Sequence, residues 1–337
     1  MKAVVMHAPF DVRIEDVPTP EPGDGEALVR ILKVGICGGD LHYYDGTSPY
    51  AVFPSIHGHE MVGVVEALNG ESQLDIGDLV TGEILLPCGT CFACRHGKPN
   101  CCANLRVIGA NATGAYAEYA VYPIRNLHPV PQGLSPDDAV LVEPYSIGYH
   151  VSHRAPVPPG ETALVIGCGT IGLTIIDVLS SMQVRVIACD LSERRLDAAR
   201  RFGAAACICS TSEDAVSRVH ALTAGEGAAL VCEATGNNAV MSQTPSFAAA
   251  GASIVLAGIT GDTVLLDGLA VTKKELSIFG SRNAAGEFGH VLKLMQHGML
   301  HQRALITKRF PLEEAAQAFA YLHQNQTREL KTVLELN

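Results

Sequence analysis

The sequence predicts an α/β protein of two domains, one rich in β-strands and one built on a doubly wound parallel sheet. Its length of 337 residues corresponds to two domains of roughly 150 residues each. The first part of the chain contains short β-like runs separated by Gly and Pro. The later part alternates apolar runs with helical stretches, a pattern typical of a parallel sheet covered by helices.

The β-rich part extends from residue 2 to about residue 131. Its β-like runs include 27–36, 61–68 and 115–121. A helical stretch is expected at 135–153, because Ser135 supplies a cap, Pro136 occupies the first turn and two acidic residues follow. The prolines and glycine of 156–160 then predict a domain boundary near residue 155.

Repeated strand and helix patterns follow that boundary. The expected pairs are 163–166 with 170–181 and 184–189 with 192–201, with further strands at 228–232 and 253–257. Two more helical stretches, 285–297 and 312–323, precede a last β-like run at 330–336.

Composition and charge exclude several classes of partner. The chain has 24 Lys and Arg against 35 Asp and Glu, a net charge of −11, and no basic block, so we expect a small-molecule substrate and no nucleic acid or membrane surface. The most continuous apolar segment, 247–259, is interrupted by glycine and shorter than the ~20 residues of a membrane-spanning helix. The apolar run 3–6 is too short for a signal peptide, which predicts a cytoplasmic protein.

Four of the eleven cysteines predict a metal site. Cys88, Cys91, Cys94 and Cys102 lie in one Gly- and Pro-containing loop with the spacing C-x2-C-x2-C-x7-C. Four thiolates this close in sequence can surround one tetrahedral Zn²⁺ and leave no position for a substrate, so the expected role is structural. Cys101 is the spare thiol, although spacing alone does not separate it from Cys102.

A second candidate metal set is dispersed through the first half. Cys37 lies in Gly-Ile-Cys-Gly-Gly-Asp, His59 and Glu60 in Gly-His-Glu, and Glu143 in Val-Glu-Pro. A thiolate, an imidazole and a carboxylate would make a three-ligand zinc site with an open position for an oxygen of the substrate. Spacing alone equally allows a buried cysteine and a hydrogen-bonded His–Glu pair.

The segment 167–172 has the pattern G-x-G-x-x-G between an expected strand and an expected helix. Gly167, Gly169 and Gly172 permit a tight turn that brings a pyrophosphate to the helix N-terminus, where Thr170 and Ile171 begin the helix. Asp190 ends the next expected strand, where its carboxylate can accept hydrogen bonds from ribose hydroxyls. This carboxylate favours NAD over NADP, although Arg194 and Arg195 could tolerate a 2′-phosphate.

In this combination and order, the three motifs make the chain resemble the zinc-containing medium-chain alcohol and polyol dehydrogenases over essentially its whole length. The resemblance implies a GroES-like β-rich catalytic domain, residues 1–154 and 285–337, and a Rossmann domain, residues 155–284. It also implies a catalytic zinc at Cys37, His59 and a glutamate, either Glu60 or Glu143, and a structural zinc at the four cysteines. By the same resemblance Arg195, Ala257, Ile259 and Ser281 contact NAD, and Arg282 contacts the substrate.

Within that family, Glu143 at the third-ligand position resembles sorbitol, L-idonate, L-galactonate and threonine dehydrogenases. The run 41–44 resembles the L-idonate type and the run 281–284 the L-galactonate type. The implied reaction is NAD-dependent oxidation of a secondary alcohol on a polyol or sugar acid to a ketone. Two alternatives stay open: a threonine 3-dehydrogenase-like enzyme, and a non-catalytic nucleotide-sensing or interaction module with the dehydrogenase fold.

One position departs from the family pattern. The family usually has Ser or Thr two residues after the catalytic cysteine, as the start of a proton relay, and here that residue is Gly39. His42 matches the histidine of the relay. The apolar run 276–279 matches the edge through which family members dimerise, so a homo-oligomer, dimer or tetramer, is expected.

Overall fold

The structure is a computed structural model that describes residues 1–48 and 51–336. The chain divides into two compact units. The first unit comprises Met1–Glu143, Ala285–Gly298 and Gln302–Asn337, and the second comprises Pro144–Ala284 and Met299–His301.

The first unit is β-rich. Its strands are β1 (Lys2–Ala8), β2 (Asp11–Asp16), β3 (Glu26–Ile36), β4 (Glu60–Asn69), β5 (Leu79–Gly82), β6 (Leu85–Leu86), β7 (Arg106–Val107), β8 (Tyr119–Pro123), β9 (Leu127–Pro129), β16 (Ile306–Pro311) and β17 (Lys331–Glu335). Its helices are α1 (Gly38–Tyr44), α2 (Phe92–Arg95), α3 (Pro136–Ala139), α10 (Phe288–Gln296) and α11 (Ala315–Asn325), with short 3-10 turns η1 (Pro99–Cys101), η2 (Ile124–Asn126), η3 (Gln302–Leu305) and η4 (Leu312–Glu314).

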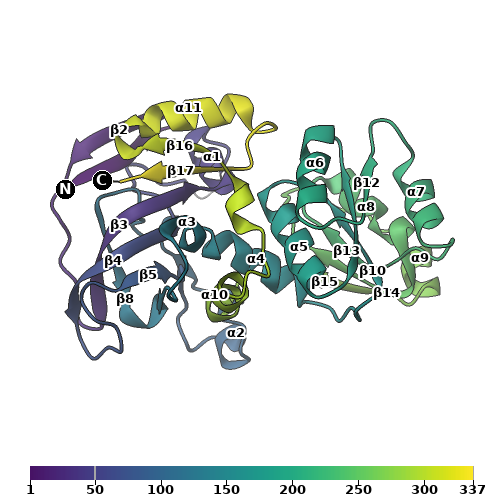
Figure 1. The fold of residues 1–337 in the computed structure, drawn as a ribbon, viewed down its shortest axis with the longest axis horizontal. Coiled ribbons are helices and arrows are strands. Elements are labelled where there is room, and N and C mark those ends of the chain that lie inside the picture. The colour runs from purple at the N-terminus through teal and green to yellow at the C-terminus, as the bar shows by residue number, and fades with distance from the viewer. Residues whose placement is uncertain (49–50, 337) are drawn as a thin grey trace. The chain divides into compact units, whose positions relative to one another are not determined.

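Strand β3 is the centre of a seven-stranded sheet in the order β16-β17-β3-β4-β5-β9, with β8 also paired to β3. Alternate residues of β3, including Val29 and Ile31, are buried in a core that also contains Tyr122 and Phe319 of α11. The purple N-terminal strand β3 and the yellow C-terminal strand β17 lie side by side in Figure 1, with Ile36 opposite Thr332. Both ends of the chain therefore build this unit.

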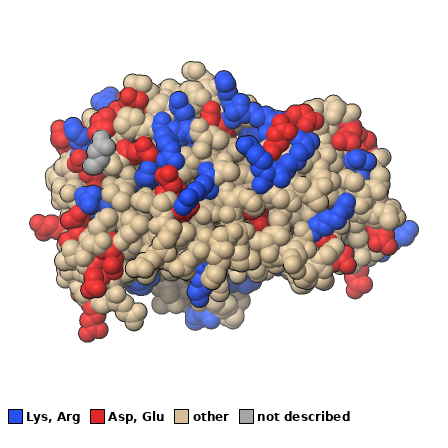
Figure 2. All heavy atoms as spheres, in the orientation of Figure 1, with Lys and Arg blue, Asp and Glu red and all other residues tan. Residues whose placement is uncertain are grey.

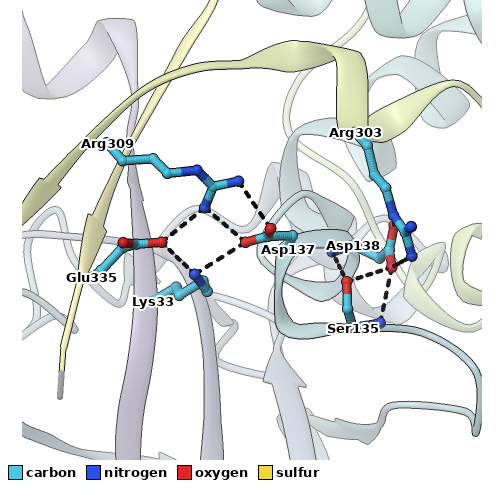
Figure 3. A network of polar contacts seen from close by, with 7 residues as sticks. All are labelled: Lys33, Ser135, Asp137, Asp138, Arg303, Arg309 and Glu335. Atoms are coloured by element: carbon cyan, nitrogen blue, oxygen red, sulfur yellow. Dashed lines mark hydrogen bonds and ion pairs between the residues drawn. The ribbon is translucent and has the colours of Figure 1, made fainter.

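A network of ion pairs joins the C-terminal segment to α3 (Figure 3). The Arg309 guanidinium donates to both carboxylate oxygens of Asp137 at 2.9 Å, and also to Glu335 at 2.8 Å. Arg303 binds Asp138 through two hydrogen bonds of 2.7 and 2.6 Å. These contacts fix the helical turn that comes just before Glu143 in the chain.

The second unit has a six-stranded parallel sheet in the order β12-β11-β10-β13-β14-β15. Its strands are β10 (Thr162–Ile166), β11 (Arg185–Asp190), β12 (Ala206–Cys209), β13 (Ala228–Glu233), β14 (Ala248–Leu256) and β15 (Ser277–Gly280). Its helices are α4 (Val142–Ser152, which begins in the first unit), α5 (Thr170–Ser181), α6 (Glu193–Arg201), α7 (Ala215–Leu222), α8 (Asn238–Phe247) and α9 (Gly268–Lys273).

The strand order of this sheet reverses between β10 and β13. Parallel strands covered by helices are buried on both faces, and the core of this unit accordingly contains Leu164, Ile187, Val231 and Ile254 from four neighbouring strands. The reversal beside β10 is the topological switch point at which open α/β sheets bind ligands. The predicted fold class, α/β with a β-rich domain and a doubly wound parallel sheet, is confirmed.

Three expectations for the elements were inaccurate. Residues 135–153 form two helices, α3 and α4, because the chain turns at Val140 and Leu141, whose side chains are buried. The β-like run 115–121 becomes a strand only from Tyr119. The β-rich half also contains helix α1, directly after β3, which the alternating pattern did not reveal.

Helix α4 decides where the two units divide. The Tyr145 hydroxyl donates to Asp177 of α5 at 2.6 Å, and a side chain at Gly148 would lie 2.4 Å from Thr174. These buried contacts attach α4 to the parallel-sheet unit. The division at 143/144 therefore comes earlier than the boundary that the prolines near residue 155 suggested.

The surface carries both signs of charge. On the face seen in Figure 2, acidic and basic side chains are interspersed. No helix of residues 1–48 and 51–336 combines the length and the apolarity that crossing a membrane requires. All eleven cysteines lie in the described part of the chain, and none of them forms a disulfide there.

Candidate active site

Cys37 lies between the end of β3 and the start of α1, and it is the N-cap of that helix. Its Sγ accepts a hydrogen bond from the Gly39 N–H at 3.5 Å, while the Asp40 carboxylate accepts from the Cys37 N–H at 2.9 Å. This reciprocal arrangement is a capping box, which satisfies two N–H groups that a helix start leaves unpaired. The sequence Cys-x-x-Asp thus fixes the direction of the sulfur.

His59 and Glu60 approach Cys37 because β4 pairs with β3. Glu60 lies opposite Gly35, and a Cβ at residue 35 would stand only 2.0 Å from Glu60 Oε2. Glycine at this position therefore makes room for the carboxylate. The ligand atoms of Cys37, His59 and Glu60 all lie within 4.8 Å of one another.

Asp40 is a buried carboxylate that organises the residues around this group. It accepts a hydrogen bond from the Tyr116 hydroxyl at 2.6 Å, and its Oδ1 lies 3.6 Å from His59 Nδ1. Burial lowers the pKa of His59, but the Asp40 carboxylate and the Cys37 sulfur outweigh it and raise this pKa well above its ordinary value. A carboxylate beside one ring nitrogen is the usual way in which proteins orient a metal-binding histidine.

Lys331 of β17 neutralises Glu60 from the other side. Its Nζ lies 2.5 Å from Glu60 Oε1 and donates to the Ile36 carbonyl at 3.3 Å, and both side chains are almost completely buried. Glu60 Oε2 has no hydrogen-bond partner among the described residues. One carboxylate oxygen is thus held by the lysine, while the other remains available to a cation.

Glu143, in the first turn of α4, is a second buried carboxylate near this group. Burial raises the pKa of Glu143 to about 7, the His59 charge opposes this shift and the Glu60 carboxylate adds to it. It lies outside the set of ligand atoms within 4.8 Å that Cys37, His59 and Glu60 form. Of the two glutamates that the sequence left open, Glu60 is the one grouped with the cysteine and histidine.

These residues fit a zinc ion. The donor set is a sulfur, an imidazole nitrogen and a carboxylate oxygen, the three ligand types that catalytic zinc sites use. Asp40 Oδ1, His59 Nδ1 and Glu60 Oε2 are buried without a hydrogen-bond partner among the described residues. Unpartnered buried polar atoms are costly, and a cation held by this group would offset that cost.

The four-cysteine loop forms the second group of candidate metal ligands. The sulfurs of Cys88, Cys91, Cys94 and Cys102 lie within 4.8 Å of one another, whereas Cys101 is exposed and outside the set. Backbone and side-chain hydrogen bonds from Thr90 lower the pKa of Cys88 to about 6, which favours a thiolate. The N–H groups of Cys88 and Asn104 donate to Cys102 Sγ at 3.3 Å. Four sulfurs fill a tetrahedral zinc shell, as a structural site requires.

In the second unit, the glycine-rich loop joins β10 to α5. Gly167 has a φ of +93°, and a Cβ at Gly172 would stand 1.7 Å from the Gly167 carbonyl oxygen, so glycine is needed at both positions. No described atom lies within 4 Å of the place where a Cβ of Gly169 would stand. The loop therefore leaves open backbone at the N-terminus of α5, where Thr170 and Ile171 form the first turn.

Asp190 ends β11 beside this loop and is almost completely buried. Its two oxygens accept hydrogen bonds from the N–H groups of Cys168 at 2.7 Å and Ser192 at 2.8 Å, and Arg195 lies 3.9 Å away. Each carboxylate oxygen has a second lone pair, so the side chain can also accept from a ribose hydroxyl. Asp190 thus supports the shape of the loop, a role that the sequence did not indicate.

The remaining predicted residues of this unit follow the carboxyl ends of β14 and β15. Ala257 and Ile259 come after β14, and Ser281 and Arg282 come after β15. The Ser281 N–H donates to the Leu256 carbonyl at 2.9 Å, and its buried Oγ has no partner among the described residues. Ligands of doubly wound sheets bind at this edge, where the glycine loop also lies.

The sequence did not indicate three residues that surround Cys37, His59 and Glu60. Asp40 had a local signal, since it stands three residues after Cys37 in a capping-box pattern. Lys331 had none, because it reaches the site only through the pairing of β17 with the distant strand β3. Tyr116 also had none: it lies before β8, where its N–H donates to the His57 carbonyl at 2.9 Å and its hydroxyl reaches Asp40.

Comparisons with known proteins agree with this geometry. Residues 23–132 match the alcohol dehydrogenase GroES-like domain, and residues 170–297 match the zinc-binding dehydrogenase domain. The starvation-sensing protein RspB of Escherichia coli K12 is 33% identical over 99% of both chains. The chain belongs to the zinc-containing medium-chain alcohol dehydrogenase family. It is a zinc-type dehydrogenase that acts on CH–OH groups with NAD, so the predicted family and enzyme class are confirmed.

Other relatives of this dehydrogenase differ in their substrates. L-galactonate-5-dehydrogenase of E. coli K12 is 32% identical and aligns with 95% of this chain and 94% of its own. Sorbitol and threonine 3-dehydrogenases of Bacillus subtilis are 29% and 33% identical. The crystal structure of rspB from E. coli CFT073, complexed with NADH, has a TM-score of 0.93 and 32% identity, with 99% of both chains covered. The two zinc sites and NAD therefore stand as this dehydrogenase's cofactors.

Proposed function

We propose that this dehydrogenase oxidises a secondary alcohol on a polyol or a sugar acid to the ketone. The observation that carries the proposal is the placement of Glu60 with Cys37 and His59, a ligand set that includes a carboxylate. Among the matching proteins, those that act on L-galactonate and sorbitol support the same substrate class. We take Glu60 as the third zinc ligand, with Glu143 as a second buried carboxylate beside it.

In this proposal the chain's own residues hold the site and move the proton. Zinc, when bound, supplies a Lewis acid that polarises the alcohol and lowers its pKa. Asp40 orients His59, and Lys331 holds one oxygen of Glu60. NAD, when bound, accepts the hydride.

His42 receives the proton that the alcohol releases. It is an exposed residue of α1, the helix that Cys37 caps, so it can pass the proton on to solvent. Gly39 offers no hydroxyl, so the proton reaches His42 through water or through a second hydroxyl of the substrate. A substrate with neighbouring hydroxyls, as in a polyol or an aldonate, supplies that group itself.

In the second unit, Gly167, Gly169 and Gly172, with Thr170 and Ile171, are proposed to bind the pyrophosphate of NAD. Asp190 would accept from the ribose, with Arg195 beside it. Ala257, Ile259 and Ser281 are proposed to line the nicotinamide end, and Arg282 to bind the substrate. These roles rest on their common position at the carboxyl edge of the sheet.

The experiment that tests the proposed function is a substrate panel. Zinc-loaded enzyme is assayed for NADH formation at 340 nm with polyols, aldonates, simple secondary alcohols and L-threonine. We expect the highest kcat/KM with a polyol or an aldonate. The second candidate is threonine 3-dehydrogenase activity, which the 33% identity to a B. subtilis enzyme of that name favours. A higher kcat/KM with L-threonine than with every polyol and aldonate would replace the proposal by that candidate.

A further inference from the structure

Helix α1 ends in a turn that returns the chain to His42. Asp45 is the C-cap of the helix, and Gly46 has a φ of +77°, a conformation that glycine adopts without strain. A side chain at residue 46 would also stand 2.7 Å from Pro9 Cγ. After this turn the Ser48 N–H donates to the His42 carbonyl at 2.9 Å. The glycine therefore directs the next residue, Thr47, back toward the imidazole.

Three side chains form a hydrogen-bonded series in this turn. His42 Nδ1 lies 2.9 Å from Thr47 Oγ1, and the Thr47 hydroxyl donates to Asp45 Oδ1 at 2.6 Å. The Thr47 N–H donates to the same Asp45 oxygen at 2.9 Å. Asp45 also lies 3.8 Å from His323 Nε2 of α11, and His42 and His323 are the two titratable groups that face it.

The direction of each bond follows from the donors available. Burial raises the pKa of Asp45, but the hydrogen bonds from Thr47, together with the nearby His42 and His323, lower this pKa below its ordinary value. Asp45 is therefore an ionised carboxylate, which only accepts. Thr47 has a single hydroxyl proton and gives it to Asp45, so toward His42 it offers only a lone pair. Nδ1 of His42 must then carry the proton that completes the third bond.

We propose that Thr47 and Asp45 are positioning residues that hold His42 in its Nδ1–H tautomer and thereby leave Nε2 as the proton-accepting atom. The inference rests on the proposed function in so far as His42 is the residue that receives the alcohol's proton. An imidazole accepts a proton only at the nitrogen whose lone pair is free, and the hydrogen bond made by the other nitrogen decides which one that is. Without Thr47, neutral His42 would be divided between two tautomers, one of which has its proton on Nε2.

The direct test is the histidine tautomer itself. Two-bond ¹H–¹⁵N spectra of ¹⁵N-histidine-labelled, zinc-loaded protein at about pH 8.5, where an ordinary histidine is neutral, distinguish the two tautomers. The His42 signals are assigned by their loss in His42→Gln. We expect the Nδ1–H pattern in the unmodified protein and in Thr47→Ser, and a mixture with Nε2–H in Thr47→Val. An Nε2–H pattern in the unmodified protein, or no change in Thr47→Val, would overturn the proposal.

Kinetics test the consequence for the reaction. Thr47→Val should lower kcat for the best substrate of the panel by about three- to tenfold and leave KM for NAD unchanged, since a relay group in the wrong tautomer slows proton transfer. Thr47→Ser, which keeps the hydroxyl, should recover most of the loss. An unchanged kcat in Thr47→Val would overturn the positioning role. Full kcat in His42→Gln would instead remove His42 from the proposed function, a result distinguishable from failure of the tautomer prediction.

Discussion

Gly39 leaves open space beside the proposed catalytic zinc site at Cys37, His59 and Glu60. The only described atom within 4 Å of a Cβ built there is Cys37 Sγ, at 3.8 Å. A serine at this position fits without displacing its neighbours. The missing hydroxyl is therefore a chemical difference from the usual family pattern, and it can be restored by one substitution.

Gly39→Ser should raise kcat/KM for a simple secondary alcohol about threefold or more relative to a polyol, because the added hydroxyl completes a relay that simple alcohols cannot complete. The measurement is kcat/KM for both substrates in both proteins. If Gly39 instead makes room for a bulky substrate, the serine will reduce polyol activity and give simple alcohols no benefit. An equal ratio in the two proteins would also reject the relay explanation.

Asp190→Ala should weaken the binding of NAD more than the binding of NADP. Hydrogen bonds to a charged group contribute about 1.5–3 kcal/mol, so kcat/KM for NAD should fall roughly tenfold or more. Both cofactors lose the support that Asp190 gives to the Cys168 and Ser192 N–H groups, but only NADP is relieved of a repulsive charge. The test is the ratio of kcat/KM for the two cofactors. A ratio near one in the unmodified enzyme would reject NAD selectivity.

At the scale of the element, the loop between β6 and β7 depends on its four sulfurs. None of the four residues of α2 is buried, so this loop has little apolar packing of its own. Zinc in such a site contributes directly to folding, whereas an open catalytic site exchanges its metal more readily. The metal of the four-cysteine site should therefore support the stability of the fold, whereas the metal of the open site should support activity.

Dialysis against a mild chelator should therefore remove one zinc per chain and abolish activity before the thermal midpoint falls. Cys91→Ser should lower the midpoint, by several degrees or more, through loss of a structural ligand. Zinc content, activity and thermal unfolding followed on the same samples give the answer. Activity and fold lost together, starting from one zinc per chain, would show that two separate sites do not exist.

Asp138 connects helix α3 to the C-terminal segment. It is buried and accepts from Ser135, Gln302 and Arg303. Burial raises the pKa of Asp138, but these hydrogen bonds outweigh it and lower the pKa to about 2. A carboxyl with a depressed folded-state pKa stabilises the fold above its unfolded pKa of about 4, and this stability is lost as the pH falls toward the folded value.

Asp138→Asn should lower the free energy of unfolding by about 1–2 kcal/mol at pH 7. The loss is smaller than for a fully buried ion pair, because Arg303 is 66% exposed and solvent screens its charge. The difference from the unmodified protein should shrink between about pH 4 and pH 2. Urea unfolding midpoints measured across this range test both statements. Glu66→Gln, which breaks the exposed Arg30–Glu66 pair, is the matched control and should change stability by less than about 0.5 kcal/mol. A pH-independent difference would contradict the linkage.

For the whole molecule, the open edge of the parallel sheet is a candidate contact between copies. Strand β15 has β14 as its one neighbour in the described sheet, and its Ile278 and Phe279 are only half-buried. Edge strands with unpaired N–H and C=O groups readily pair with another chain. We propose that β15 pairs with its copy around a twofold axis.

Sedimentation velocity at micromolar concentration should therefore show a dimer, or a tetramer made of two such dimers. Ile278→Lys, which places a charge on the pairing strand, should shift the protein toward monomer. Ile76→Lys, at a residue that is 68% exposed in the first unit, controls for the added charge. A monomer in the unmodified protein would refute the proposal.

The sequence by itself determined what depends on neighbouring residues. The four cysteines lie within one loop, so their closeness in sequence predicted the metal site, and the structure decided only that Cys102 and not Cys101 is the fourth member. The glycines of 167–172 are fixed by a local turn, and Gly172 must lack a side chain because it meets the Gly167 carbonyl five residues earlier. The repeated strand–helix patterns predicted the parallel sheet, because each strand and the helix after it are close together in sequence.

The tertiary structure alone decided what depends on distant strands. Lys331 reaches Glu60 only because β17, β3 and β4 pair in that order, which joins residues that are 271 positions apart. The same pairing brings Glu60 within 4.8 Å of the candidate ligand atoms of Cys37 and His59, a group that does not include Glu143. Helix α4 joined the parallel-sheet unit through buried contacts with α5, and the prolines near residue 155 gave no sign of this. Strand register and side-chain packing are set by the whole core, and no local pattern records them.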